Sequence, residues 1–280
     1  FFFFKQKTAY EIRNCDWSAD VCSSDLVLDP LAAGRAAGGL AVMIPVPLPP
    51  EPACFDRSVR QEGLAHLHEQ GQDPAQPPRS SSLWTLKRLD ASGNERTAEY
   101  WQRAREDLRA GYNNRCVYSC FVIETERLAD GREQSGHSID HFEPKSRAAA
   151  RRAYDWDNLR WAWRVIDNEG KGNHWIPAEH DPTAMTAPLL QLAEDEGGNW
   201  LVVPDPGLEH SEQTRLRETI GLLGLNLRKV VLRRNAYVDD FLNNGPDYGP
   251  TWMQERQPFV YRELRRIFDR WAAGLESAAR

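Results

Sequence analysis

The chain has little of three things that would narrow its class quickly: paired cysteines, long apolar runs and a surplus of basic residues. Its five cysteines fall at irregular positions, which is not the disulfide framework of a small secreted protein, so we expect a reducing cytoplasm. No run of about 18 apolar residues occurs, and we therefore expect no membrane-spanning helix. The net charge of -6 gives no chain-wide attraction to nucleic acid.

The residues that are present are typical of a soluble globular protein, with 41% hydrophobic residues, 27% charged residues and ten tryptophans. A chain of 280 residues is expected to form one main domain with appendages, since a domain runs to roughly 100–200 residues. Arginines gather in one short region, where a local positive field can oppose the net charge. These arginines are Arg147, Arg151, Arg152, Arg160 and Arg164.

The first residues differ in character from the rest. Residues 1–26 resemble the translated read-through of a sequencing adapter and no targeting peptide, because no small-residue cleavage site follows an apolar stretch. We expect residues 1–42 to be a non-native leader, with Met43 as a candidate natural start. Residues 43–94 are rich in Pro, Gln and Ser, which predicts an extended N-terminal arm over the surface.

Periodicity predicts an α+β chain. Thr97–Tyr112 has apolar residues at helical spacing, whereas residues 116–124 are rich in β-formers and can pair with a second strand over residues 137–142. Residues 158–165 predict a short helix with Asp157 or Asn158 as its cap. Three further helices are predicted over residues 211–224, 226–242 and 258–275, so that residues 211–280 form a C-terminal helical region.

The segment SIDHFEPKS, followed by YDWDNLRWAW and DNEGKGN, has a pattern suited to chemistry. At a strand end, Asp140 can hold a hard cation while the adjacent His141 stays off the metal and takes a proton from water. Hydrolysis of a phosphodiester needs this division, because the metal stabilises charge in the transition state. Asn158 is expected to orient the imidazole, and an oxygen ligand near the helix end to complete the metal site.

An isolated Asp-His pair is most often a surface turn, but the ordered set DHF, PKS, W-x-N and N-x-x-K is far more specific. With it the chain resembles the HNH endonucleases of the Septu and retron-associated anti-phage systems. The similarity extends to IPVPLPPEP, FDRSVRQEG, the Tyr100-Trp101 pair, CVYSC and TIGLLGLN, from Met43 to about Leu242.

This resemblance implies a ββα-metal (HNH) nuclease core within residues 95–210, with flanking helices. It implies cleavage of DNA, or alternatively RNA, with His141 as general base, Asp140 as metal ligand and Asn158 as the orienting residue. Mg²⁺ is the expected cofactor, with Mn²⁺ as an alternative. Members of the family act beside an ATPase that senses infection, which implies a partner ATPase and a role in antiviral defence.

The chain departs from the HNH pattern in two places. Many HNH domains carry two CxxC pairs around zinc, whereas Cys116 and Cys120 are three residues apart and no second pair follows, so we expect no structural zinc. The second departure is at the third motif position. Counting nine residues forward from Asn158 gives Asp167 as the ligand, whereas counting three residues back from Lys171 gives Asn168. One residue has been inserted, and we prefer Asn168 as the ligand because it keeps the N-x-x-K spacing.

Lys145, Arg147 and Lys171 are candidates for phosphate contacts, although each taken singly is as well explained as a solvated surface charge. Two rival functions remain open. One is a binding module that keeps the HNH fold but no longer cuts, acting with the partner ATPase. The other is a toxin that cleaves RNA, since metal and base act on the phosphate and do not distinguish the sugar.

Overall fold

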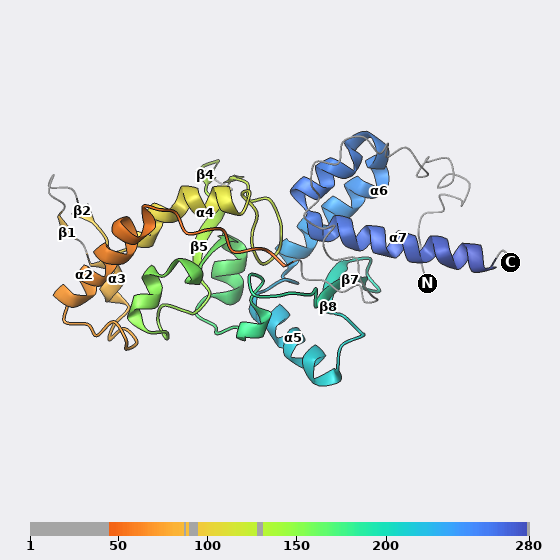
Figure 1. The fold of residues 1–280 in the computed structure, drawn as a ribbon. Coiled ribbons are helices and arrows are strands. Elements are labelled where there is room, and N and C mark those ends of the chain that lie inside the picture. Colours follow the sequence, from red (N-terminus) through yellow and green to blue (C-terminus); the bar gives the residue numbers. More distant parts are fainter. Residues whose placement is uncertain (1–44, 87, 90–94, 128–130, 279–280) are drawn as a thin grey trace.

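The computed structural model describes residues 45–86, 88–89, 95–127 and 131–278, so the expected leader and the candidate start at Met43 lie outside it. The described chain is a mixed α+β protein with small antiparallel sheets, as the sequence predicts. In Figure 1 the N-terminal helices occupy one end of the molecule and the C-terminal helices the other, with strand β5 in the N-terminal part. Among the described helices, none has the length and apolarity needed to cross a membrane.

The expected N-terminal arm contains three helical elements. The helical elements are η2 (Asp56–Gln61), α2 (Glu62–Glu69) and α3 (Ser82–Thr85). They fold against the body of the protein because one face is apolar, with Val59 and Leu67 buried. Gly63 lies so close to the ring of Tyr154 that a Cβ there would overlap it. The prediction of an extended arm was therefore wrong for residues 56–69.

The predicted helix over Thr97–Tyr112 is confirmed. It consists of η3 (Tyr100–Ala104), a 3₁₀ turn, followed by α4 (Arg105–Gly111). The apolar residues that gave the helical spacing are all buried; they are Tyr100, Trp101, Ala104, Leu108 and Tyr112.

The predicted hairpin of residues 116–124 with residues 137–142 is not found, because residues 137–141 pair with a later segment. The CVYSC box is a tight turn and not a strand: the amide of Cys120 donates to the carbonyl of Cys116 at 2.8 Å, and Cys120 has a left-handed φ of 59°. The predicted helix over residues 158–165 is mostly strand β6 (Leu159–Trp163), which pairs antiparallel with β5 (His137–His141). Every residue of β6 is buried, so its apolar run carries no alternation that would have marked a strand.

Strands β5 and β6 place the candidate residues at one end of a hairpin. In their register Asp140 faces Arg160 and His141 faces Leu159. The connection between them contains two short 3₁₀ helices, η4 (Ala150–Tyr154) and η5 (Trp156–Asn158). Helix η6 (Ile166–Lys171) follows β6 closely, so the local order is strand, strand, helix.

The C-terminal region is helical as predicted, with α5 (His210–Leu222), α6 (Arg228–Arg256) and α7 (Pro258–Ala278). Gly224, at a φ of 65°, follows α5 as the expected stop. A hairpin of β7 (Leu190–Glu194) and β8 (Trp200–Pro204), which the sequence reading did not anticipate, packs between α5 and the last two helices. The remaining short elements are β1 (Arg88–Leu89), β2 (Glu95–Arg96), β3 (Glu126–Arg127), β4 (Glu133–Gln134) and η7 (Ala178–His180).

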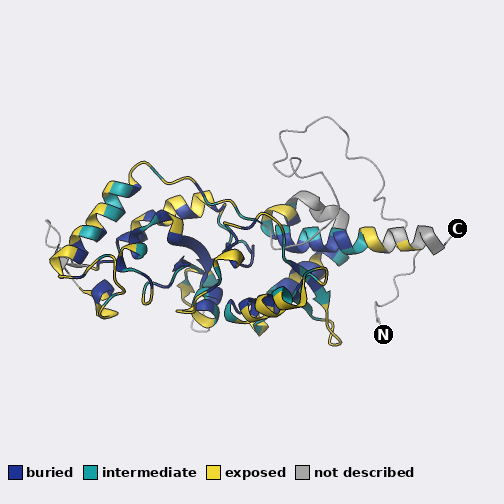
Figure 2. Cartoon of the chain, turned by 60° about the horizontal axis from the view of Figure 1, so that its bottom comes forward, coloured by how far each residue is buried: buried dark blue, intermediate teal, exposed yellow. Residues whose placement is uncertain are grey.

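Buried residues form a continuous apolar cluster that runs from the N-terminal helices through the β5–β6 hairpin to α7. Figure 2 shows the buried ribbon concentrated around that hairpin and where α6 and α7 meet the rest of the chain. The candidate site therefore lies next to the buried core and not on a peripheral loop.

Candidate functional site

Asp140 lies near the end of β5 with both carboxylate oxygens bound by buried donors. The hydroxyl of Tyr118 donates to Oδ2 at 2.5 Å, and the ammonium of Lys171 donates to Oδ1 at 3.0 Å. Lys171 also donates to the carbonyl of His141 at 2.7 Å. Asp140 is 4% exposed and Lys171 is completely buried. Lys171, expected as a phosphate contact, thus forms an internal ion pair with the expected metal ligand.

The carboxylate of Asp167 is the second acid of the site. Burial raises its pKa to about 6, and the negative charge of Asp140 adds to the shift, which places the two acids close together. Ser138, on β5, donates a hydrogen bond to Asp167. Asn168, the ligand preferred from the sequence, is exposed. The structure thus brings Asp167, and not Asn168, to Asp140.

The segment in which the two ways of counting the third motif differ is a π-helical turn. Helix η6 has π geometry, and the amide of Gly172 donates to the carbonyl of Asp167 at 2.6 Å, five residues back. Such a turn absorbs one extra residue without ending a helix. Asp167 and Lys171 both reach Asp140 as a result, which the two ways of counting the motif could not establish.

His141 is buried and neutral. Desolvation lowers its pKa to about 3, with further lowering by the charges of Lys145 and Lys171. Its Nε2 lies 3.2 Å from the carbonyl oxygen of Ala153, and a carbonyl only accepts, so Nε2 carries the proton and Nδ1 keeps a lone pair. The edge of Trp101 packs against the imidazole, with ring centroids 4.9 Å apart.

Asn158 braces the loop after β5 and does not bond to His141 in the expected way. Its side-chain oxygen accepts from the amide of Glu143 at 2.7 Å, and its nitrogen donates to the carbonyls of Glu143 and Arg152 at 3.1 and 2.8 Å. Ala153, which holds the imidazole, follows Arg152 directly. The orienting effect of Asn158 on His141 is therefore indirect, through this backbone.

Most of the clustered arginines are engaged within the protein. Arg152 pairs with Glu143 and two aspartates, and Arg160 is buried against Asp181 at 2.5 Å. Arg164 donates to Gln134. Arg147 and Arg151 are exposed. The ammonium of Lys145 lies 4.8 Å from the ring of Trp101, the same ring that packs on His141, so Lys145 is one of the cations beside the candidate base.

The donor set fits a magnesium-type cation better than zinc. Mg²⁺ binds one or two carboxylates and completes its coordination shell with water and phosphate. Asp140 and Asp167 supply two such carboxylates, close enough that the charge of one raises the pKa of the other. Among the described residues there is no group of three or more His, Cys, Asp and Glu side chains able to hold a metal. Burial raises the pKa of Cys116 and brings that of Cys120 to about 12, which disfavours the thiolates that zinc needs.

Sequence reasoning missed Tyr118 as a site residue. The CVYSC box could have indicated it, since the resemblance includes that box although it lies outside the nuclease motif.

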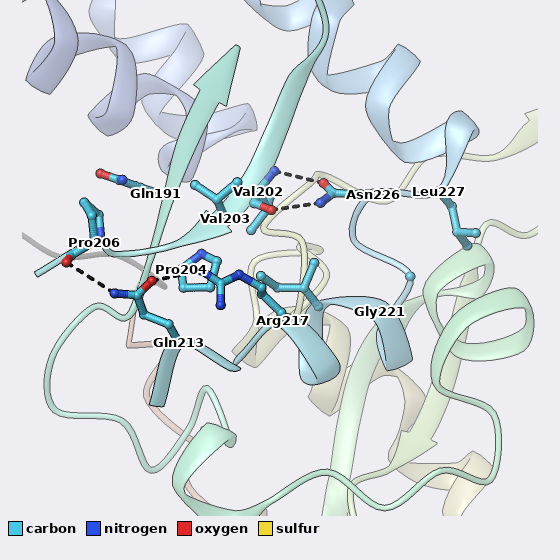
Figure 3. A pocket seen from close by; sticks show the side chains of 12 residues that line it. Gln191, Val202, Val203, Pro204, Pro206, Gln213, Arg217, Gly221, Asn226 and Leu227 are labelled. Carbon is cyan, nitrogen blue, oxygen red and sulfur yellow. Dashed lines mark hydrogen bonds between the residues drawn. The ribbon is translucent and has the colours of Figure 1, made fainter. Parts of the chain in front are cut away.

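A separate cleft of about 690 Å³ lies between the β7–β8 hairpin and α5, lined by residues that include Val203, Arg217 and Leu227 (Figure 3). Asn226 and Gln213 are engaged there by backbone groups of Val202, Pro206 and Leu208, and the cleft contains none of the candidate site residues.

Comparison with models of known protein families and with curated proteins gives no match for this chain. The case for a function therefore depends on the geometry of the site and on the motifs of the sequence.

Proposed function

We propose that the chain is a metal-dependent endonuclease of the HNH type, with β5, β6 and η6 as its ββα-metal core. One observation carries the proposal: the neutral, buried imidazole of His141 follows Asp140 directly, and a second carboxylate, Asp167, lies beside Asp140. His141 is thus available to accept a proton, while Asp140 and Asp167 are available to bind a cation, and metal-dependent phosphodiester hydrolysis uses both roles.

Asp140 and Asp167 would hold the cation, and Mg²⁺ is the best fit, with Mn²⁺ as an alternative. When bound, such a cation neutralises charge on the phosphate and on the leaving oxygen. His141 takes the proton of the attacking water at Nδ1, since its Nε2 proton is held by Ala153. The pKa of about 3 belongs to the site without an anion; a phosphodiester beside the imidazole raises that pKa towards the range of an effective base.

We further propose DNA as the substrate, a place in anti-phage defence beside a partner ATPase, and action in the cytoplasm. The support is the resemblance in the DHF, PKS, W-x-N and N-x-x-K boxes, and the thiols of Cys54, Cys116 and Cys120, which are free. Lys145, which lies over Trp101 beside His141, and the exposed Arg147 are the candidates for phosphate contacts.

Plasmid nicking by the chain from Met43 tests the nuclease proposal. Wild type is expected to nick in Mg²⁺ or Mn²⁺ and to stop in EDTA, and His141→Ala is expected to lose about 10²–10⁴-fold in rate, the usual contribution of a general base. His174→Ala is the matched control, because His174 is exposed three residues beyond the site lysine. Equal loss in both variants, or cutting that survives EDTA, would contradict the assignment.

A binding module with the same fold is the second candidate, and one observation favours it. Both oxygens of Asp140 are already bound, by Tyr118 and Lys171, and Lys171 supplies a positive charge where a metal would otherwise be needed. A protein that binds DNA or RNA but cuts neither in any metal, with or without its partner ATPase, would favour this reading. Competition between DNA and RNA substrates distinguishes the DNA nuclease from an RNA-cleaving toxin.

A further inference from the structure

Tyr118 reaches Asp140 from a part of the chain that is separate from the nuclease motif. Its hydroxyl donates to Oδ2 of Asp140 at 2.5 Å across 22 residues of sequence, and the side chain is 3% exposed. The other oxygen of Asp140 receives Lys171. The two donors together fix the rotation of the carboxylate about its last bond.

The turn that carries Tyr118 does not need this hydroxyl in order to fold. The amide of Cys116 donates to the carbonyl of Phe121 at 2.8 Å, and the amide of Val117 donates to Trp161 on β6 at 2.9 Å. The hydroxyl is thus an addition to a turn that the backbone already attaches to the hairpin. Its effect is concentrated on the carboxylate that it contacts.

Tyr118 also differs from Lys171 in charge. A tyrosine hydroxyl is an uncharged donor at neutral pH, whereas the lysine ammonium carries a positive charge. A neutral donor orients a carboxylate without competing with a cation for its charge, whereas the ammonium of Lys171 does compete.

We propose that Tyr118 is a positioning residue of the metal site, which holds the carboxylate of Asp140 in the orientation that receives the cation. The inference rests on the proposed nuclease function. Hydrogen-bond partners of ligating carboxylates usually contribute 10–100-fold to metal affinity, because the ligand is already oriented when the metal arrives.

Tyr118→Phe removes the hydroxyl and keeps the ring. Mn²⁺ affinity, measured by electron paramagnetic resonance of free Mn²⁺, is expected to fall about 10–100-fold. The Mn²⁺ concentration for half-maximal nicking is expected to rise by the same factor, with the rate at saturating Mn²⁺ close to wild type. Tyr112→Phe is the matched control: Tyr112 is comparably buried, but its hydroxyl lies near Arg160 and Asp181 and is not hydrogen-bonded to Asp140.

The outcomes separate the inference from the function on which it rests. Wild type that binds no Mn²⁺ and cuts nothing overturns the nuclease proposal, and the role of Tyr118 with it. Wild type that binds and cuts, with Tyr118→Phe matching it in Mn²⁺ affinity, overturns the positioning role alone. A fall in the saturated rate without a shift in metal dependence indicates a general structural role and also overturns it; thermal unfolding of both variants checks that they are folded.

Discussion

Asp167 combines two effects that oppose its ionisation, burial and the neighbouring charge of Asp140. Its folded-state pKa of about 6 lies above the ordinary 3.8, so the folded protein binds the proton more tightly than the unfolded chain does. Without metal, this residue therefore costs stability increasingly as pH rises from about 4 through 6, and the full cost remains at neutral pH. A cost of this kind at a buried pair of acids is expected where a cation belongs.

Replacing Asp167 with Asn removes that cost. Without divalent metal, Asp167→Asn is expected to be more stable than wild type at pH 7.5 by roughly 1–3 kcal/mol, since one pKa unit corresponds to about 1.4 kcal/mol. At pH 4 the difference is expected to vanish. Urea unfolding at both pH values measures it, and Mn²⁺ binding of the same variant is expected to be lost.

Asn168→Ala is the companion variant at the residue scale. Asn168 is exposed, so we expect neither a stability change nor a loss of Mn²⁺ binding. Loss of the metal in Asn168→Ala, with Asp167→Asn unaffected, would restore the ligand preferred from the motif spacing. The sequence predicted that an oxygen ligand lies at one of these two positions, but only the π turn of η6 determines which one faces Asp140.

At the scale of elements, helix η6 owes its position to a close approach of two backbones. A Cβ on Gly170 would lie 2.7 Å from the carbonyl carbon of Leu223, at the end of α5. Glycine is required there because no side chain fits between η6 and this turn. The contact holds η6 closely against the end of α5.

Gly170→Ala is expected to destabilise the protein by about 1–3 kcal/mol, as other overpacked sites do, and to reduce metal-dependent nicking by moving η6. Gly221→Ala is the matched control on α5. A Cβ on Gly221 meets nothing within 4 Å, and alanine favours the helix, so this variant is expected to gain about 0.5–1 kcal/mol. Thermal unfolding and nicking of the pair are measured side by side; a tolerated Gly170→Ala would contradict this packing.

Strand β6 shows why the type of this element was hard to predict from the sequence. LRWAW has four apolar residues around a buried arginine and is buried on both faces, a pattern that short helices and central strands share. Of the predicted strand, strand and helix, only the strand over residues 137–142 is confirmed, as β5; residues 116–120 form a turn, and the predicted helix is mostly strand β6. The amphipathic helices were predicted well because one solvent-facing side gave them a clear period.

At the scale of the whole molecule, the C-terminal helices pack on the turn that carries Tyr118. The rings of Phe121 and Tyr237 stack with centroids 5.8 Å apart, and the side-chain amide of Gln257 donates to the carbonyl of Ser119 at 3.4 Å. Arg233 donates to the carbonyl of Val122 at 2.8 Å. The C-terminal helical region therefore packs on the core that contains the candidate site.

Leu264→Ala, in α7, is expected to cost about 2–5 kcal/mol, because Leu264 is 1% exposed and its loss leaves a cavity. Leu232→Ala, on α6, is the control at 54% exposure and is expected to change little. If the molecule unfolds as one unit, Leu264→Ala lowers a single transition seen alike by tryptophan fluorescence and by loss of nicking. Two separate transitions, with only one affected, would show that residues 211–280 fold independently.

The sequence by itself determined that Asp140 and His141 stand side by side, and it predicted the places where most helices form. Asp140 and His141 are adjacent in the sequence, and amphipathic periods are local, so neither required knowledge of the fold. Tertiary structure decided the rest: that Asp167 supplies the second carboxylate, that Lys171 is an internal counter-ion, and that Tyr118 holds Asp140. These depend on contacts across 22 to 31 residues of sequence, on burial and on one π turn, which no local pattern of residues encodes.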